Sequence, residues 1–261
     1  MRPGFFITVE GIDRSGKSTQ VERLCSSLCA RGLPVGVLDG PDAAVRAGGW
    51  LREPGGTPTG EAVRDILLHR RDDVAPWAEA LLYAAARAQL VRDVVAPSLA
   101  AGLVVVLDRY VDSSLAYQGH ARGLGVGAVL DLNLPATGGL LPDLTVLLRI
   151  DAGRAARRPG GPPDRLEAEG RAFQVAVAAG YDALVARWPD RIRVVDGEQP
   201  LDAVAADVER LALDALAAAG FGSSGETPPV ARHAMGDPGD GSADAAAGGA
   251  THGAATGGSR V

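Results

Sequence analysis

The sequence predicts an α/β fold in which a five-stranded parallel sheet is flanked by helices on both faces. Short apolar runs recur along the chain and alternate with helical patterns. Runs that are apolar at every position, rather than at every second one, are typical of strands buried on both faces of a parallel sheet. The runs are FFITVE (5–10), PVGVL (34–38), LVVVL (103–107), LTVLLRI (144–150) and IRVV (192–195).

Two helical patterns support this alternation of strands and helices. Val21, Leu24 and Leu28 recur with the spacing of one helix face, shortly after the first apolar run. A longer pattern runs from Trp77 towards Pro97 through AEALLYAAARAQLVRDVV. Strands that alternate with helices in this way predict parallel pairing rather than hairpins.

Composition and charge narrow the class of protein. The net charge of −6 argues against a surface that coats a nucleic acid polymer or an anionic membrane. No apolar run approaches the ~18 residues of a membrane span, and the N-terminus has no signal-peptide pattern. Cys25 and Cys29, one helical turn apart, are expected to be small buried side chains of a reduced protein rather than metal ligands. We therefore expect a cytoplasmic protein.

The chain is expected to form one domain, residues 1–214, followed by a tail. Within the domain, residues 39–50 (DGPDAAVRAGGW) follow the second apolar run and predict an irregular insert. Residues 215–261 contain mainly Gly, Ala, Ser, Pro and Asp, with almost no large apolar side chain. Such a segment cannot bury enough surface to offset the entropy lost on ordering, so we predict a disordered tail.

A glycine-rich loop follows the first apolar run. The motif G-x-x-x-x-G-K-[ST] of P-loop NTPases occurs as GIDRSGKS, residues 11–18. Its glycines let backbone N–H groups converge on phosphate oxygens, its lysine reaches the β- and γ-phosphates, and its hydroxyl ligates Mg²⁺. The loop lies between a strand and an amphipathic helix, as a nucleotide site requires. The residues assigned to ATP are Gly11, Ile12, Asp13, Arg14, Ser15, Gly16, Lys17, Ser18 and Thr19.

A second phosphate-handling element is LVVVLDRY, residues 103–110. Asp108 follows the apolar run, where a P-loop protein holds its Mg²⁺, so Asp108 and Ser18 are the predicted metal ligands. Arg109 occupies the position where a motor ATPase would place a carboxylate to activate water, and an arginine there suits a second phosphate group. The N-K-x-D pattern that reads guanine is absent from the sequence. These features favour phosphoryl transfer over hydrolysis or signalling.

An arginine-rich segment, RAARRPGGPPDR, spans residues 154–165. If it is helical, Arg154, Arg157 and Arg158 share one face, and a Pro/Gly loop leads on to Arg165. A run of charge is usually a solvated face. An arginine cluster beside a mobile loop is also typical of a lid that closes over a triphosphate, so we predict a lid at 152–168.

Six segments, in order, resemble thymidylate kinase: VEGIDRSGKSTQ, REPGGTPTGEAVRDIL, ALLYAAARAQL, DRYVDSSLAYQGHARGLG, LPDLTVLLRI and DRLEAEG. The match covers about residues 5–210, and REPGGT and DRYVDSSLAYQG are far more specific than the phosphate loop. The resemblance implies transfer of the ATP γ-phosphoryl group to dTMP in dTTP synthesis, giving dTDP and ADP, by a Mg²⁺-dependent homodimer.

The resemblance also implies an acceptor site. Arg109 would grip the dTMP phosphate, and Asp13 would lie near the sugar 3′-hydroxyl. Tyr83 would stack on thymine, where the family usually has Phe, and Arg87 would hydrogen-bond the thymine edge. The spacing of Tyr83 and Arg87 places both on one helix face. The residues implied for dTMP are Asp13, Arg52, Glu53, Pro54, Arg64, Tyr83, Arg87, Arg109, Ser114, Tyr117 and Gln118.

Some positions depart from the family pattern. The insert at 39–50 precedes REPGGT, and Ala86 stands where a polar residue is common. Residues 173–181 lack basic residues that are frequent there, and Arg149 ends a strand where an acidic residue is common. A divergent kinase with another pyrimidine acceptor therefore stays open, as do a P-loop NTPase switch and a silent nucleotide-binding module.

Catalysis in this interpretation needs positioning and charge neutralisation. The acceptor phosphate is already an oxyanion, so no general base is required. Transition-state charge is assigned to Lys17, Arg14, Arg109 and the lid residues Arg158 and Arg165.

Overall fold

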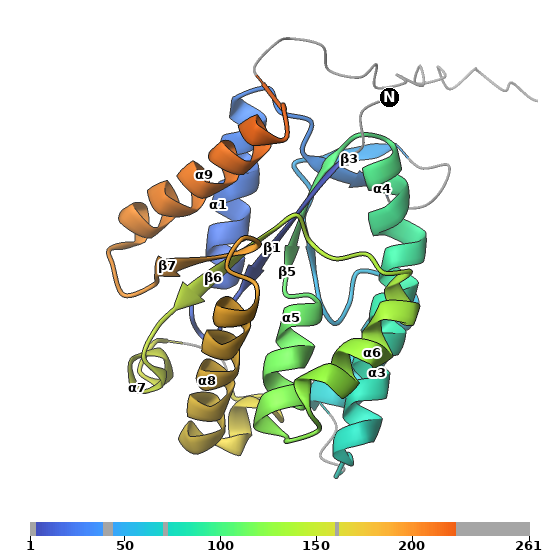
Figure 1. Ribbon diagram of the computed structural model, residues 1–261, viewed down its shortest axis with the longest axis vertical. Helices are drawn as coiled ribbons and strands as arrows, with labels where there is room; N and C mark the ends of the chain where they lie inside the picture. Colours follow the sequence, from blue (N-terminus) through green and yellow to red (C-terminus); the bar gives the residue numbers. More distant parts are fainter. Residues whose placement is uncertain (1–3, 39–43, 70–72, 160–161, 223–261) are drawn as a thin grey trace, which may run out of the picture. The chain divides into compact units, whose positions relative to one another are not determined.

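The computed structural model describes residues 4–38, 44–69, 73–159 and 162–222 (Figure 1). Its centre is a five-stranded sheet in the order β4–β5–β1–β6–β7, with neighbouring strands parallel. The strands are β1 (Phe5–Glu10), β4 (Leu51–Arg52), β5 (Val104–Asp108), β6 (Leu144–Arg149) and β7 (Ile192–Asp196). The predicted α/β fold with a five-stranded parallel sheet is confirmed.

Alternate side chains of the central strand β1 face two apolar cores on opposite sides of the sheet. Phe5 and Ile7 point into a core shared with α1 (Lys17–Ala30) and α9 (Leu201–Ala218), helices that Figure 1 shows side by side. Phe6 points into the other core, which the remaining helices cover. Because helices bury both faces, the strands are apolar throughout, and the sequence shows continuous runs rather than alternation.

Several helices that pack against the second core carry residues of the candidate active site. They are α2 (Pro58–Arg64), α3 (Pro76–Leu90), α4 (Ala96–Ala100), α5 (Val111–Ser114), α6 (Val126–Thr137), α7 (Ala152–Ala156) and α8 (Arg171–Arg187). Three π-helical segments extend this series: η1 (Asp65–His69) after α2, η2 (Val91–Val95) between α3 and α4, and η3 (Leu115–Ala121) after α5. The helix predicted from Trp77 towards Pro97 thus corresponds to α3, η2 and the start of α4.

The loops that follow the parallel strands meet at the carboxyl edge of the sheet. β1 leads into the glycine-rich loop, β4 into the REPGG segment, β5 into Arg109 and β6 into α7. β1 lies between β5 and β6, so chain connections leave it towards both sides of the sheet. In open parallel sheets, ligands bind in the crevice that forms at such a point.

One predicted strand lies in a different sheet. Gly36–Leu38 (β2) pairs antiparallel with Val45–Ala47 (β3), and Val35 forms an isolated bridge to the main sheet at Val104. The edge strand of the main sheet is instead the two-residue β4, immediately before Glu53. The prediction of an irregular insert at 39–50 is therefore wrong for residues 45–47, which form a strand, while residues 39–43 lie outside the described residues. Residues 45–47 are the strand that pairs with β2, and they precede β4 at the edge of the main sheet.

The predicted domain end at residue 214 is too early. Helix α9 continues to Ala218, and Leu216 is fully buried against the core on the α1 side. An apolar stripe in phase with the rest of α9 keeps the helix ordered past the point where the composition changes. The rest of the predicted tail, residues 223–261, lies outside the described residues. No helix in the described part of the chain has both the length and the apolarity needed to cross a membrane.

Candidate active site

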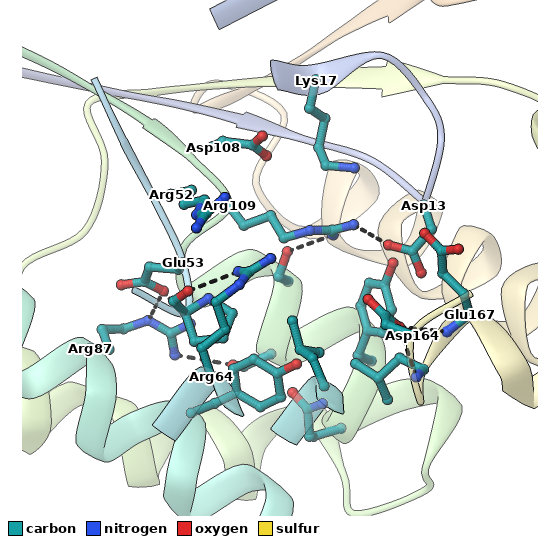
Figure 2. Close-up of a pocket in the computed structure, with 18 of the residues that line it drawn as sticks. Asp13, Lys17, Arg52, Glu53, Arg64, Arg87, Asp108, Arg109, Asp164 and Glu167 are labelled. Carbon is teal, nitrogen blue, oxygen red and sulfur yellow. Dashed lines mark hydrogen bonds and ion pairs between the residues drawn. The ribbon is translucent and has the colours of Figure 1, made fainter. Parts of the chain in front are cut away.

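A cavity of about 250 Å³ opens at the carboxyl edge of the sheet. Its walls come from the glycine-rich loop, the REPGG segment, α3, the DRY segment and the loop before η4 (Glu167–Glu169) (Figure 2). Every residue that the resemblance assigns to dTMP lines this cavity, and so do Lys17, Ser18 and Asp108. The structure thus brings the phosphate loop and the proposed acceptor residues, far apart in sequence, around one space.

The glycine-rich loop has the backbone that its sequence predicts. Gly11 has φ of +148°, and a Cβ there would lie 2.7 Å from the carbonyl oxygen of Leu148, so only glycine fits. Lys17 Nζ donates to the Ile12 carbonyl oxygen at 2.8 Å, which folds the side chain back under the loop. Burial, followed by repulsion from Arg109, lowers the pKa of Lys17 to about 8.

Arg109 crosses the cavity towards the glycine-rich loop (Figure 2). Its Nη1 donates to the Gly11 carbonyl oxygen at 3.0 Å and to Ser113 Oγ at 3.1 Å, and its Nη2 forms an ion pair with Asp13. The guanidinium also lies 5.1 Å above the ring centre of Tyr117. Burial alone would raise the pKa of Asp13, but Arg109 and then Lys17 hold it below its usual value. The hydrogen bonds, the ion pair and the ring of Tyr117 together fix the orientation of the Arg109 guanidinium.

Arg87 forms the opposite wall, where Figure 2 shows it facing Glu53. Its guanidinium is almost fully buried and forms an ion pair of 2.6 Å with Glu53, while Nη1 donates to Ser114 Oγ at 3.0 Å. Nη2 also donates to the carbonyl oxygen of Tyr110 at 3.0 Å. These contacts lock the side chain, and the second carboxylate oxygen of Glu53 is buried without a hydrogen bond from the described residues.

Ser18 and Asp108, the residues predicted to hold Mg²⁺, are hydrogen-bonded to each other. Ser18 Oγ donates to Asp108 Oδ2 at 2.5 Å. Asp108 Oδ1 is buried and has no hydrogen-bond partner among the described residues, which leaves an oxygen of the kind that Mg²⁺ binds. No group of three or more His, Cys, Asp or Glu side chains in the described part of the chain could hold a metal by itself.

The predicted lid arginines separate. Helix α7 ends at Ala156, so the expectation that Arg154, Arg157 and Arg158 share one helical face is wrong. Arg158 Nη1 instead donates to the Ser15 carbonyl oxygen at 2.7 Å, against the outside of the glycine-rich loop. Arg165 Nε donates to the Leu67 carbonyl oxygen at 2.7 Å, and its guanidinium forms an ion pair of 2.5 Å with Glu79. Residues 160–161, between them, lie outside the described residues.

Arg14 links the glycine-rich loop to the lid segment. It forms an ion pair of 2.8 Å with Glu167, next to the cavity. Its φ of +60° lies in the left-handed region, which is unusual for a residue with a side chain. The backbone of the loop therefore carries strain at Arg14.

Two residues that hold site residues in place, Glu10 and Gln174, were not predicted from the sequence. Glu10, the last residue of β1, accepts hydrogen bonds from Ser113 Oγ at 2.6 Å and Tyr181 Oη at 2.8 Å beneath Arg109. Burial, followed by repulsion from Asp112, raises the pKa of Glu10 to about 7. Gln174 on α8 holds Asp13 through a 2.7 Å bond from its Nε2. The sequence does contain a signal for Glu10, because this carboxylate is the last residue of an otherwise apolar strand. No local sequence pattern identifies Gln174 as a site residue.

The geometry defines a class of protein. A phosphate loop with its lysine and a wall of arginine, aromatic and amide side chains line one cavity, and the described residues of this lining include no histidine. Such a double site is that of a nucleoside monophosphate kinase on a P-loop fold, an ATP-dependent phosphotransferase.

Comparison with known proteins gives the family. The thymidylate kinase family matches residues 9–208. A thymidylate kinase from Leifsonia xyli subsp. xyli is 50% identical over 210 residues, 79% of this chain and 93% of that protein. Thymidylate kinases from Pelotomaculum thermopropionicum and Deinococcus radiodurans are each 44% identical, over 82% and 80% of this chain and 94% and 96% of their own lengths. The chain belongs to the thymidylate kinase family.

Proposed function

We propose that this chain transfers the γ-phosphoryl group of ATP to dTMP, giving dTDP and ADP in dTTP synthesis. The observation that carries the proposal is the single cavity shared by Lys17 of the phosphate loop and by Tyr83 and Gln118 of the acceptor wall. A donor phosphate on the loop and an acceptor nucleotide on the wall would meet within it, which converts a reaction between two molecules into one between held groups.

Positive charge in the cavity supports direct transfer. Lys17 would reach the β- and γ-phosphates, and Arg109 would hold the acceptor phosphate against them. Arg109 is already oriented by Gly11, Ser113 and Asp13, so little reorganisation is needed as charge develops. The acceptor oxygen needs no base, which agrees with a lining that contains no histidine.

The acceptor wall suits a pyrimidine that carries a proton on N3. Gln118 lines the cavity, and its Nε2 donates to Glu79 Oε1 at 2.8 Å. Its amide oxygen has no hydrogen bond within the described part of the chain. That oxygen can accept from the N3–H of thymine or uracil, whereas cytosine presents a lone pair at N3. Tyr83 on α3 offers the ring on which the base would stack.

Mg²⁺ and the remaining partners belong to the same proposal. Ser18 and Asp108 would hold Mg²⁺, which would neutralise charge on the donor phosphates.

We further propose a homodimer, since α3 exposes Trp77 and Leu81 one turn apart, as a subunit contact would. The two cysteines are free thiols, in keeping with a cytoplasmic protein.

A panel of acceptors tests the proposal. With Mg²⁺ and ATP, we expect dTDP to form from dTMP with a kcat/KM at least about tenfold above those for dUMP and dCMP, given the worth of single contacts in a pocket. Formation of diphosphates and of ADP is measured together by ion-exchange chromatography. Without an acceptor, ADP formation should be negligible, since the described residues that line the cavity include no histidine to activate water.

Each alternative gives its own result in the same panel. A better diphosphate yield from another pyrimidine would favour a divergent kinase, and rapid ATP hydrolysis without acceptor would favour an NTPase switch. ATP binding with no transfer to any monophosphate would indicate a silent nucleotide-binding module. No dTDP from dTMP would refute the proposal.

Replacing Arg14 by glycine is expected to lower kcat by about tenfold without abolishing turnover, less than the loss of a sole charge-stabilising donor would cost. Glycine accepts φ of +60°, so the substitution removes the guanidinium without new backbone strain. Arg158 lies against the same loop and can supply a second guanidinium. Arg158→Ala should have a similar partial effect, and the double variant should lose far more than either. An Arg14→Gly enzyme as inactive as Lys17→Ala would show that Arg158 does not share the role.

A further inference from the structure

We propose that Glu79 is a positioning residue that sets base specificity, by fixing which end of the Gln118 amide faces the acceptor base. The proposal rests on the proposed function, because it explains how the acceptor pocket distinguishes an N3–H pyrimidine from cytosine. Glu79 does not line the cavity and lies in the first turn of α3. It would therefore act on the substrate only through Gln118.

Glu79 is a buried carboxylate that accepts hydrogen bonds from two other segments of the chain. Its side chain is fully buried. Oε1 accepts from Gln118 Nε2 at 2.8 Å and, more weakly, from Arg122 Nε at 3.4 Å. Oε2 accepts from Arg165 Nη2 at 2.5 Å and Arg122 Nη2 at 3.2 Å. The lid segment, η3 and α3 thus converge on one pair of oxygens. A buried carboxylate with this many donors fixes its neighbours, because losing any of these bonds would leave a polar group unpaired.

The chemistry of a carboxylate decides the orientation of Gln118. Carboxylate oxygens in this ion pair only accept, so Gln118 must offer its NH₂ group to Glu79. The amide oxygen is then directed away from Glu79, on a residue that lines the cavity. A glutamine without such a partner could present either end, since its two rotamers differ by a flip of O and N. Glu79 therefore makes Gln118 an acceptor towards the base.

Because Arg165 and Arg122 also donate to Glu79, the single substitution Glu79→Gln is expected to reverse the orientation of the Gln118 amide. In Glu79→Gln, the amide oxygen of the new side chain should stay on the Oε2 side, because Arg165 and Arg122 make their two shorter bonds there, whereas the Oε1 side receives a single arginine bond of 3.4 Å. Its NH₂ group then replaces Oε1 and faces Gln118. Two NH₂ groups cannot pair, so Gln118 must turn over and point its NH₂ group at the base. The pocket would then match the N3 lone pair of cytosine instead of N3–H.

The test compares dTMP and dCMP as acceptors for Glu79→Gln and the wild-type enzyme. We expect the KM for dTMP to rise by about tenfold or more, the cost of leaving a buried polar pair mismatched, with a smaller change in kcat. The ratio of kcat/KM for dTMP to that for dCMP should fall by at least about tenfold. Thermal melting and ATP binding verify that the variant is folded. A variant that loses stability or activity with both acceptors equally, at an unchanged ratio, would overturn the proposal.

Glu169→Gln is the matched control. Glu169 also pairs with Arg122, at 2.6 Å, but has no contact with Gln118 in the described part of the chain. The substitution should leave the acceptor ratio within about twofold of wild type, because it disturbs the ion-pair cluster and not the amide.

The double variant Glu79→Gln, Gln118→Glu exchanges the two partners and tests the same pairing in reverse. It should restore the preference for dTMP over dCMP. The carboxylate introduced by Gln118→Glu would accept from the new NH₂ group on α3 and keep an oxygen directed towards the base. No recovery of the ratio would count against the proposal.

The wild-type enzyme gives a readout that does not depend on a Glu79 variant folding. In ¹⁵N spectra, the side-chain NH₂ of Gln118, assigned by its loss in Gln118→Glu, should exchange slowly with solvent before dTMP is added. Rapid exchange of both protons would contradict a fixed bond to Glu79. Failure of dTMP to react with the wild-type enzyme would instead refute the proposed function, so the two hypotheses fail separately.

Discussion

Replacing Lys17 by arginine is expected to lower kcat by about 10²–10³, nearly as much as Lys17→Ala, although arginine keeps the charge. Lys17 is buried under the loop, with Nζ 2.8 Å from the Ile12 carbonyl oxygen. A compact ammonium on a flexible stem fits that space, and a planar guanidinium does not. The γ-phosphate would therefore lose the ammonium group that neutralises its negative charge during transfer.

The composition of the chain makes this prediction easy to check. Lys17 is the only lysine in the sequence, so all other basic side chains are arginine or histidine. An amine-acylating reagent can thus modify only Lys17 and the N-terminal amine, and the lowered pKa of Lys17, about 8, leaves much neutral amine at mildly alkaline pH. ATP should protect Lys17 but not the N-terminus, as measured by mass spectrometry. A Lys17→Arg enzyme with kcat within about tenfold of wild type would contradict the role of Lys17.

The parts of the fold that local patterns specify could be predicted. GIDRSGKS is contiguous, so one stretch fixes the loop, its glycine conformations and its lysine. The carboxyl ends of parallel strands share one edge, and this placed Asp108 and Arg109 near the loop. The acceptor wall was predicted only through the family resemblance, because Tyr83 and Gln118 carry no chemistry that periodicity alone would reveal.

The features that were missed depend on contacts between distant segments. Strand β4 has two residues, Leu51 and Arg52, too few for any period to be visible, so the apolar run at 34–38 is the one that the sequence predicts as a strand of the main sheet. The Glu79–Arg165 ion pair joins positions 86 apart in sequence. The error at α7 had a local signal, since Pro159 disfavours helical geometry at Arg158, the residue before it.

Replacing Arg109 by lysine is expected to lower kcat/KM for dTMP by about 10²–10³, the cost of one well-placed charge-stabilising donor. The guanidinium binds Gly11 and Ser113 through one nitrogen and Asp13 through another, and it stacks on Tyr117. A lysine has a single ammonium and no plane, so it cannot keep these contacts while also facing a phosphate. Both KM for dTMP and kcat should change, whereas ATP affinity should stay within a few-fold. Steady-state kinetics with each substrate varied in turn separates these effects.

Arg191→Lys is the control that distinguishes lost catalysis from lost structure. Arg191 resembles Arg109 in burial, with 15% of its side chain exposed against 17%, and it also pairs with an aspartate, Asp112, at 2.6 Å. It does not line the cavity. Both variants should therefore lose stability in thermal melting, since each gives up a partly buried ion pair and a further hydrogen bond of its guanidinium. Only Arg109→Lys should lose turnover, and equal losses of turnover in the two would mean that Arg109 holds the fold together rather than the acceptor phosphate.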